Sequence, residues 1–113
     1  TTEADALQGL TTAWAVVDGI PATPTITVGF NVASIAKIAT GHYRITFTTP
    51  QSSVNYAVFG TIESSDITPA VDDTSFFHIA ASRTTSVFDI FIYDESTLLG
   101  VDAVFHIQVL GGR

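Results

Sequence analysis

Three histidines are the side chains best suited to acid–base or metal chemistry near neutral pH. His42, His78 and His106 lie far apart in the chain, each within a segment of strand-like composition. No two of them have the short spacing of histidine pairs that bind metal from one element, and the chain has no cysteine to complete a zinc site. We therefore expect no metal and no other cofactor, and we interpret the histidines as partly buried, hydrogen-bonded residues. A symmetry axis that brings copies of one histidine together is the remaining place for a metal.

Acidic side chains form the second group that suggests chemistry, because oxygen-rich loops bind calcium and paired carboxylates hydrolyse glycosides. They gather between the expected strands, at Glu63, Asp66, Asp72, Asp73, Asp94, Glu95 and Asp102. The order and glycine placement of an EF-hand are absent, as are a Gly-x-Ser-x-Gly elbow and a glycine-rich phosphate loop. Whether two carboxylates lie at a catalytic separation depends on the fold. The pattern favours solvated loops, and we expect a protein that is not an enzyme.

Composition limits the class of protein. The chain has 113 residues, of which 46% are hydrophobic and 13% charged, which is typical of one folded domain. Its net charge is −7, and its basic residues Lys37, Arg44, Arg83 and Arg113 are scattered, which argues against nucleic acid and anionic lipid as partners. No apolar run approaches the about 20 residues of a membrane-spanning helix, and no signal peptide is visible. We expect no membrane insertion, and the lack of cysteine gives no support to a disulfide-stapled secreted scaffold.

The elements that must position these residues are β-strands, because runs of β-branched and aromatic residues alternate with turn formers. The segment from Phe30 to Pro50 has the pattern of two strands joined at Thr40-Gly41. We predict an all-β fold, an antiparallel β-sandwich of about 7–8 strands. The predicted strands are Ala13–Asp18, Thr25–Val32, His42–Thr49, Val54–Glu63, Ser75–Ser82, Thr85–Tyr93 and Ala103–Leu110.

The expected domain is residues 12–113, with residues 1–11 as a connector from an upstream segment. A chain that begins without methionine is expected to be a piece of a longer polypeptide.

Alternation along the strands predicts the core. In the strand that begins at His42, an apolar set alternates with a polar one, as in a strand with one wet side. We predict burial within one protomer for Trp14, Phe30, Tyr43, Ile45, Phe47, Tyr56, Ile90 and Ile107.

Several strands are apolar on both faces, notably Val54–Glu63 and Thr85–Tyr93. A two-layer sandwich buries only one face of each sheet, so a second apolar face is covered either by short loops or by identical subunits. We favour identical subunits. The candidate interface residues are Phe59, Phe76, Phe77, Tyr93 and Leu98.

The first half of the chain contains a set of short motifs at Ala13–Val16, Phe30–Ser34, Gly41–Phe47, Pro50 and Asn55–Val58. Together they resemble a domain found near the C-termini of tail fibres and related virion proteins of tailed bacteriophages. The second half of the chain adds a Thr84–Ile90 strand, a loop with Asp102 and a closing strand that ends at Gly112. The resemblance therefore leaves out only about the first ten residues.

This resemblance implies a homotrimeric virion module of a tail fibre, or of another fibre or decoration protein, that works outside the cell. Such modules touch the host surface, so a cell-surface glycan or protein is the implied partner. Two features depart from the pattern: Val28-Gly29 stands where a charged residue is usual, and Ala36–Gly41 replaces a polar link. The apolar content of this link indicates that it packs against something.

Recognition of a host is expected on loops, because the strands supply the scaffold. The longest polar connection is Glu63–Thr74, followed by Asp94–Asp102. The alternative for Leu98 and Leu99 in the second loop is that they pack against a neighbouring subunit. The candidate receptor contacts are Ser65, Asp66, Asp72, Asp73, Asp94 and Glu95.

The alternative interpretation is a lectin-like sandwich outside a virion, since small carbohydrate-binding sandwiches share this size and strand content. Sugar binding places an aromatic ring beneath a pyranose, and Trp14, Tyr43 and Tyr93 are the candidates by residue type. Alternation places Tyr43 in the core, and core packing is the commoner role for all three. A fibre shaft upstream of Thr1 would indicate the virion protein, whereas a signal peptide would indicate the secreted lectin.

Overall fold

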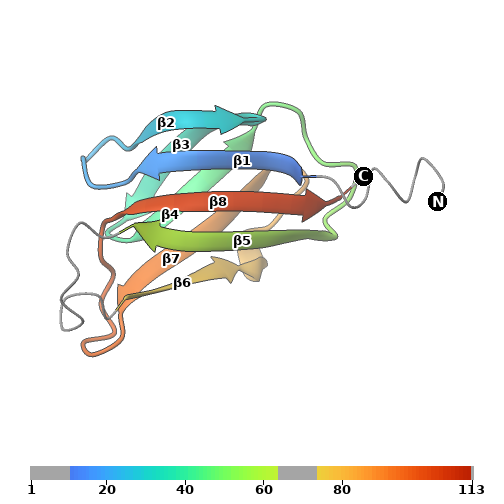
Figure 1. Cartoon of the computed structure of the whole chain (residues 1–113). Helices are drawn as coiled ribbons and strands as arrows, with labels where there is room; N and C mark the ends of the chain where they lie inside the picture. Colours follow the sequence, from blue (N-terminus) through green and yellow to red (C-terminus); the bar gives the residue numbers. More distant parts are fainter. Residues whose placement is uncertain (1–10, 64–73, 113) are drawn as a thin grey trace.

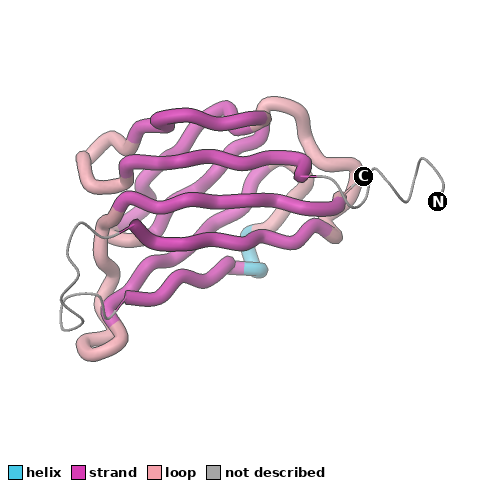
Figure 2. The backbone as a smooth tube through the Cα atoms, in the orientation of Figure 1, coloured by secondary structure: helices cyan, strands magenta, loops and turns pink. Residues whose placement is uncertain are grey.

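The computed structural model describes residues 11–63 and 74–112, and within them it has eight β-strands and one 3-10 turn. The strands form two four-stranded antiparallel sheets, which we call sheet A (β2-β1-β8-β5) and sheet B (β3-β4-β7-β6) (Figure 1). Figure 2 shows the strands connected by loops, with the 3-10 turn after β6. The predicted all-β fold with antiparallel pairing is confirmed. The elements are β1 (Thr11–Asp18), β2 (Thr25–Phe30), β3 (Val32–Ala39), β4 (His42–Phe47), β5 (Tyr56–Glu63), β6 (Thr74–Ile79), the turn Ala80–Ser82, β7 (Val87–Asp94) and β8 (Val104–Gly111).

The segment from Phe30 to Pro50 contains the predicted hairpin, β3–β4, and Gly41 at its turn has a φ of 75° that favours glycine. The predicted strand Thr25–Val32 is divided at Asn31, whose φ is 58°. The Asn31 amide donates to the carbonyls of Thr12 and Thr49, and its oxygen accepts from the Thr49 amide. These bonds hold the chain where it leaves sheet A and enters sheet B.

The core lies between the two sheets. Six of the eight predicted core residues are buried, which confirms the alternation used for Tyr43, Ile45, Phe47, Tyr56, Ile90 and Ile107. The prediction for Trp14 and Phe30 is wrong, since their exposed fractions are 38% and 54%. The small side chains of Ala13 and Ala15 face the core from β1 instead.

A buried polar network joins the loops at one end of the sandwich. The Tyr43 hydroxyl donates to the Gly19 carbonyl at 2.7 Å and lies 3.0 Å from Asp102 Oδ1. The same carboxylate accepts from the Gly41 amide and from Lys37 Nζ, at 2.9 and 2.7 Å. Burial opposes ionisation of Asp102, but these donors outweigh it and hold the pKa of Asp102 below its ordinary value. The network joins the β1–β2 loop, the β3–β4 turn and the β7–β8 loop.

Candidate functional site

The outer face of sheet A carries the largest exposed side chains of its strands. Cross-strand pairing places Phe30, Trp14, Gln108 and Phe59 in one row that crosses β2, β1, β8 and β5. The rings of Phe30 and Phe59 are each 54% exposed. The neighbouring row, two residues along each strand, contains Val28, Val16, His106 and Thr61. A row with aromatic residues on three of the four strands and Gln108 on the fourth is thus open to solvent in a single protomer.

This face divides into two halves of different chemistry. The apolar half consists of Val28 and Phe30 on β2 with Trp14 and Val16 on β1, and Val28 is 50% exposed. Strand β2 has no charged residue, and β1 has only Asp18 at its last position. The mixed half lies over β8 and β5 and combines one aromatic ring with polar side chains; it consists of Phe59, Thr61, Glu63, His106 and Gln108.

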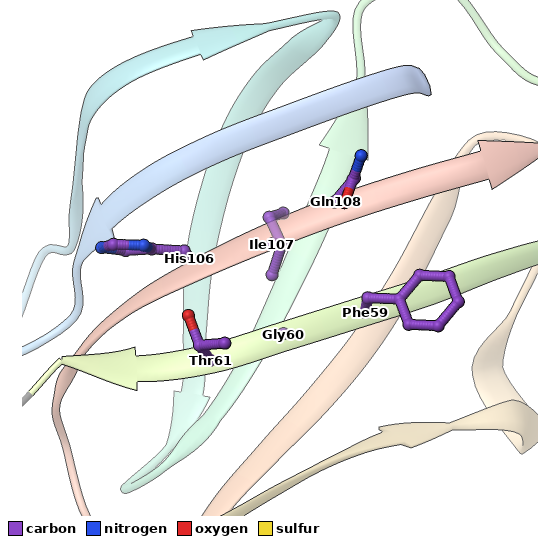
Figure 3. A pocket seen from close by; sticks show the side chains of 6 residues that line it. All are labelled: Phe59, Gly60, Thr61, His106, Ile107 and Gln108. Carbon is purple, nitrogen blue, oxygen red and sulfur yellow. The ribbon is translucent and has the colours of Figure 1, made fainter. Parts of the chain in front are cut away.

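The mixed half contains an open depression of about 350 Å³ (Figure 3). Its floor is the main chain at Gly60 and Ile107, because the Ile107 side chain is buried in the core and Gly60 has none. On the inner side, the Phe76 ring occupies the space that a Cβ at Gly60 would need. On the outer face, no side chain therefore rises from Gly60 or Ile107, and the sheet is flat between the cross-strand pairs that flank these two residues.

Those flanking pairs supply the polar groups. Phe59 lies opposite Gln108 at one end of the depression, and Thr61 lies opposite His106 at the other (Figure 3). His106 Nε2 lies 2.9 Å from Glu63 Oε2, and the Gln108 amide nitrogen donates to the Thr11 hydroxyl at 2.7 Å. These contacts orient the imidazole and the amide and leave His106 Nδ1 and Gln108 Oε1 as further hydrogen-bonding groups.

The outer face of sheet B is chemically different, because a buried carboxylate lies in it. Asp89 on β7 is 1% exposed and accepts two bonds from the Arg44 guanidinium, at 2.8 and 3.1 Å. His42 Nε2 lies 2.8 Å from the same carboxylate. Burial raises the pKa of Asp89, but the bonds from Arg44 and His42 outweigh burial, so its pKa lies below the ordinary value of 3.8.

Replacing Asp89 by asparagine is expected to lower the free energy of unfolding at pH 7 by about 1–3 kcal/mol, because Arg44 and His42 lose a charged acceptor. Since the folded-state pKa is depressed, this stability is present above the unfolded pKa of about 3.9 and is lost as the pH falls through the folded value. Urea unfolding at pH 7 and pH 3 measures it: wild type should lose more stability on acidification than Asp89→Asn.

Glu63→Gln is the control for this change. Glu63 also pairs with a histidine, His106, but the Glu63 side chain is 56% exposed. An exposed pair contributes about 0–1 kcal/mol. Equal losses in Asp89→Asn and Glu63→Gln would contradict the role given to the buried carboxylate.

Two of the six predicted receptor contacts, Asp94 and Glu95, lie within the described residues. Ser65, Asp66, Asp72 and Asp73 lie outside the described residues. Asp94 Oδ1 accepts from the amide and the hydroxyl of Ser96, which closes a turn and lowers the pKa of Asp94. Glu95 accepts a hydrogen bond from the Ser75 hydroxyl. Asp94 therefore stabilises a turn within the β7–β8 loop, and Glu95 connects this loop to β6.

The predicted interface residues have different positions. Phe59 and Leu98 are 54% and 72% exposed, whereas Phe76 packs against the core of its own protomer. Phe76 faces inward because Gly60 leaves room for its ring. Tyr93 is half-buried, with its ring stacked on Phe91 at 6.0 Å. The side chain of Phe77 lies outside the described residues.

Loop packing explains part of the apolar outer face of β7. Gly100 pairs with Tyr93, and a Cβ at Gly100 would lie 3.0 Å from the Phe91 ring, so the β7–β8 loop covers this end of the strand. On the described strands, the exposed large hydrophobic residues are Trp14, Val28, Phe30 and Phe59 on sheet A and Ile38 on sheet B; the others lie in loops.

Sequence reasoning did not identify this face as a site, and neither Gly60 nor Thr61 was proposed for it. Trp14 and Phe30 were assigned to the core, and Gln108 was not singled out. A signal for them was present, because the alternation that buries Ile107 turns His106 and Gln108 outward. Of the aromatic residues considered for sugar binding, Trp14 is on the open face and Tyr43 is fully buried.

Within residues 11–63 and 74–112, no three His, Asp or Glu side chains gather as a metal-binding group. No helix in this part of the chain is long and apolar enough to span a membrane. Comparison of the chain with protein-family models, with curated proteins and with solved structures finds no match.

Proposed function

We propose that the chain is a structural module of a phage virion, in a tail fibre or another fibre or decoration protein, and that it assembles as a homotrimer through the apolar half of sheet A. The observation that carries this proposal is the exposure of Trp14, Phe30 and Val28 side by side on two strands with almost no charge. The motif set described above supplies the link to virion fibres. Attachment to the host surface is the role that such a module would serve.

The physical reason for self-association is the free energy of the exposed apolar surface. Soluble monomers rarely leave a contiguous apolar patch of this kind in water unless it binds something. Identical copies are suitable partners, because three charge-poor apolar halves that converge on a threefold axis would each be covered by the other two subunits. The outer face of sheet B lacks this property, since Arg44 and the buried Asp89 make it polar.

A lectin-like protein outside a virion is the second candidate, and the mixed half of sheet A favours it. One open aromatic ring beside polar side chains over a flat floor is an arrangement that suits a sugar. The two candidates differ in where the protein is found, because a virion module is a fixed part of a particle and a lectin is free.

Purified virions of the phage that encodes the chain test this proposal. Mass spectrometry is expected to detect the chain in the particles, and immunogold electron microscopy is expected to label a fibre or the particle surface. The control is a mock purification from uninfected cells. Absence of the chain from particles, with recovery from the medium as free protein, would contradict the virion assignment and favour the lectin.

A further inference from the structure

We propose that the depression in the mixed half of sheet A binds one pyranose ring of a neutral saccharide. This inference deepens the proposed attachment role and rests on it only for the biological setting. The site is built from the two cross-strand pairs Phe59–Gln108 and Thr61–His106, with the main chain of Gly60 and Ile107 between them.

The dimensions fit a single sugar ring. The two pairs are separated by two residues along each strand, or about 7 Å. The volume of about 350 Å³ lies at the small end of ligand sites. The floor is flat, because neither Gly60 nor the buried Ile107 sends a side chain toward the opening. A ring lying on this floor would contact both pairs at once.

The chemistry fits a ligand with one apolar face and many hydroxyl groups. The Phe59 ring is 54% exposed and offers its face or edge to the C–H groups of a sugar. At the same end, Gln108 Oε1 is an acceptor on an amide whose nitrogen is already fixed to Thr11. At the other end, the Thr61 hydroxyl both donates and accepts, and His106 is held by Glu63 with Nδ1 unused by that contact. Hydroxyl groups are the partners that suit this mixture of donors and acceptors.

Charge selects a neutral ligand over an anionic one. Among the described residues, no lysine or arginine lines the depression. The Glu63 carboxylate lies beside it, in contact with His106. The chain carries a net charge of −7. A phosphate, sulfate or sialic acid would therefore meet a repulsive field with no cation to pair with it.

Nuclear magnetic resonance with purified chain tests the proposal, with the methyl glycosides of glucose, galactose, mannose and N-acetylglucosamine as probes. At least one glycoside is expected to shift backbone amide resonances of β5 and β8, centred on Gly60 and Ile107. Phe59→Ala is expected to weaken that binding about tenfold, the effect of losing one aromatic contact. Gln108→Ala should weaken it as well.

Phe30→Ala is the matched control, because Phe30 is a phenylalanine on the same face with the same 54% exposure but lies outside the depression. Its affinity for the glycoside should equal that of wild type, and monovalent probes remove any effect of avidity. No shift with any probe, shifts elsewhere, or equal affinity in wild type and Phe59→Ala would overturn the proposal. A negative result with the trimer intact would leave the virion assignment untouched.

Discussion

Replacing Phe47 by alanine is expected to lower the free energy of unfolding by about 3–5 kcal/mol. Phe47 is 4% exposed, and its ring lies 5.4 Å from the rings of both Tyr56 and Phe88. Tyr56 belongs to sheet A and Phe88 to sheet B, so the ring connects the two layers. Its removal takes away apolar contacts and leaves a cavity that rigid sheets cannot close. Urea unfolding followed by circular dichroism measures the loss.

Phe59→Ala is the control for this prediction, because the chemical change is the same but the ring is 54% exposed. Its effect should stay below about 1 kcal/mol. A loss below about 1 kcal/mol for Phe47→Ala as well would mean that the alternation along β4 has been assigned to the wrong face.

Local pattern was sufficient to predict β4 and its partners in the core. In β4, apolar residues alternate with His42, Arg44 and Thr46, so only one face can be buried. The turn at Gly41 followed from residue type as well. These features depend on a few consecutive residues, and for that reason sequence alone predicted them.

The pattern was ambiguous on β1, where both faces are apolar. Trp14 and Val16 alternate with Ala13, Ala15 and Val17, and the prediction placed the large Trp14 side chain inside. In the structure the small set faces inward, because Tyr43, Phe88 and Phe105 already fill the centre. Phe30 pairs with Trp14 and is turned outward with it. Volume complementarity between distant strands decides such cases, and no local pattern contains it.

The candidate site depends on pairing between strands that lie far apart in the chain. Alternation alone turns Gln108 and His106 outward on β8. It does not show that β5 lies beside them in a register that places Phe59 opposite Gln108 and Thr61 opposite His106. The depression therefore became visible only with the sheet order.

Replacing Val28 by aspartate is expected to convert the proposed trimer into monomers. Val28 lies in the apolar half, and a short carboxylate there would be buried in each subunit contact without a partner. The effective cost of burying such a charge is several kcal/mol, on the order of 3 kcal/mol per subunit. Dilution series analysed by light scattering measure the change. The fluorescence emission of Trp14, the single tryptophan, should shift to longer wavelength as dissociation exposes its indole ring to water.

Ile38→Asp is the matched control. Ile38 is a β-branched residue on the edge strand β3 of sheet B, and its exposed fraction of 48% is close to the 50% of Val28. Both substitutions place the same carboxylate on an exposed edge strand, so any general loss of strand stability should be similar. If Ile38→Asp dissociated the trimer and Val28→Asp did not, the interface would lie on sheet B, and its assignment to sheet A would be wrong.

The mass of the wild-type chain in solution tests the central claim most directly. Size-exclusion chromatography with multi-angle light scattering at micromolar concentration is expected to give three times the chain mass of 12.0 kDa. A mass equal to one chain across the whole concentration range would contradict assembly through the apolar half of sheet A.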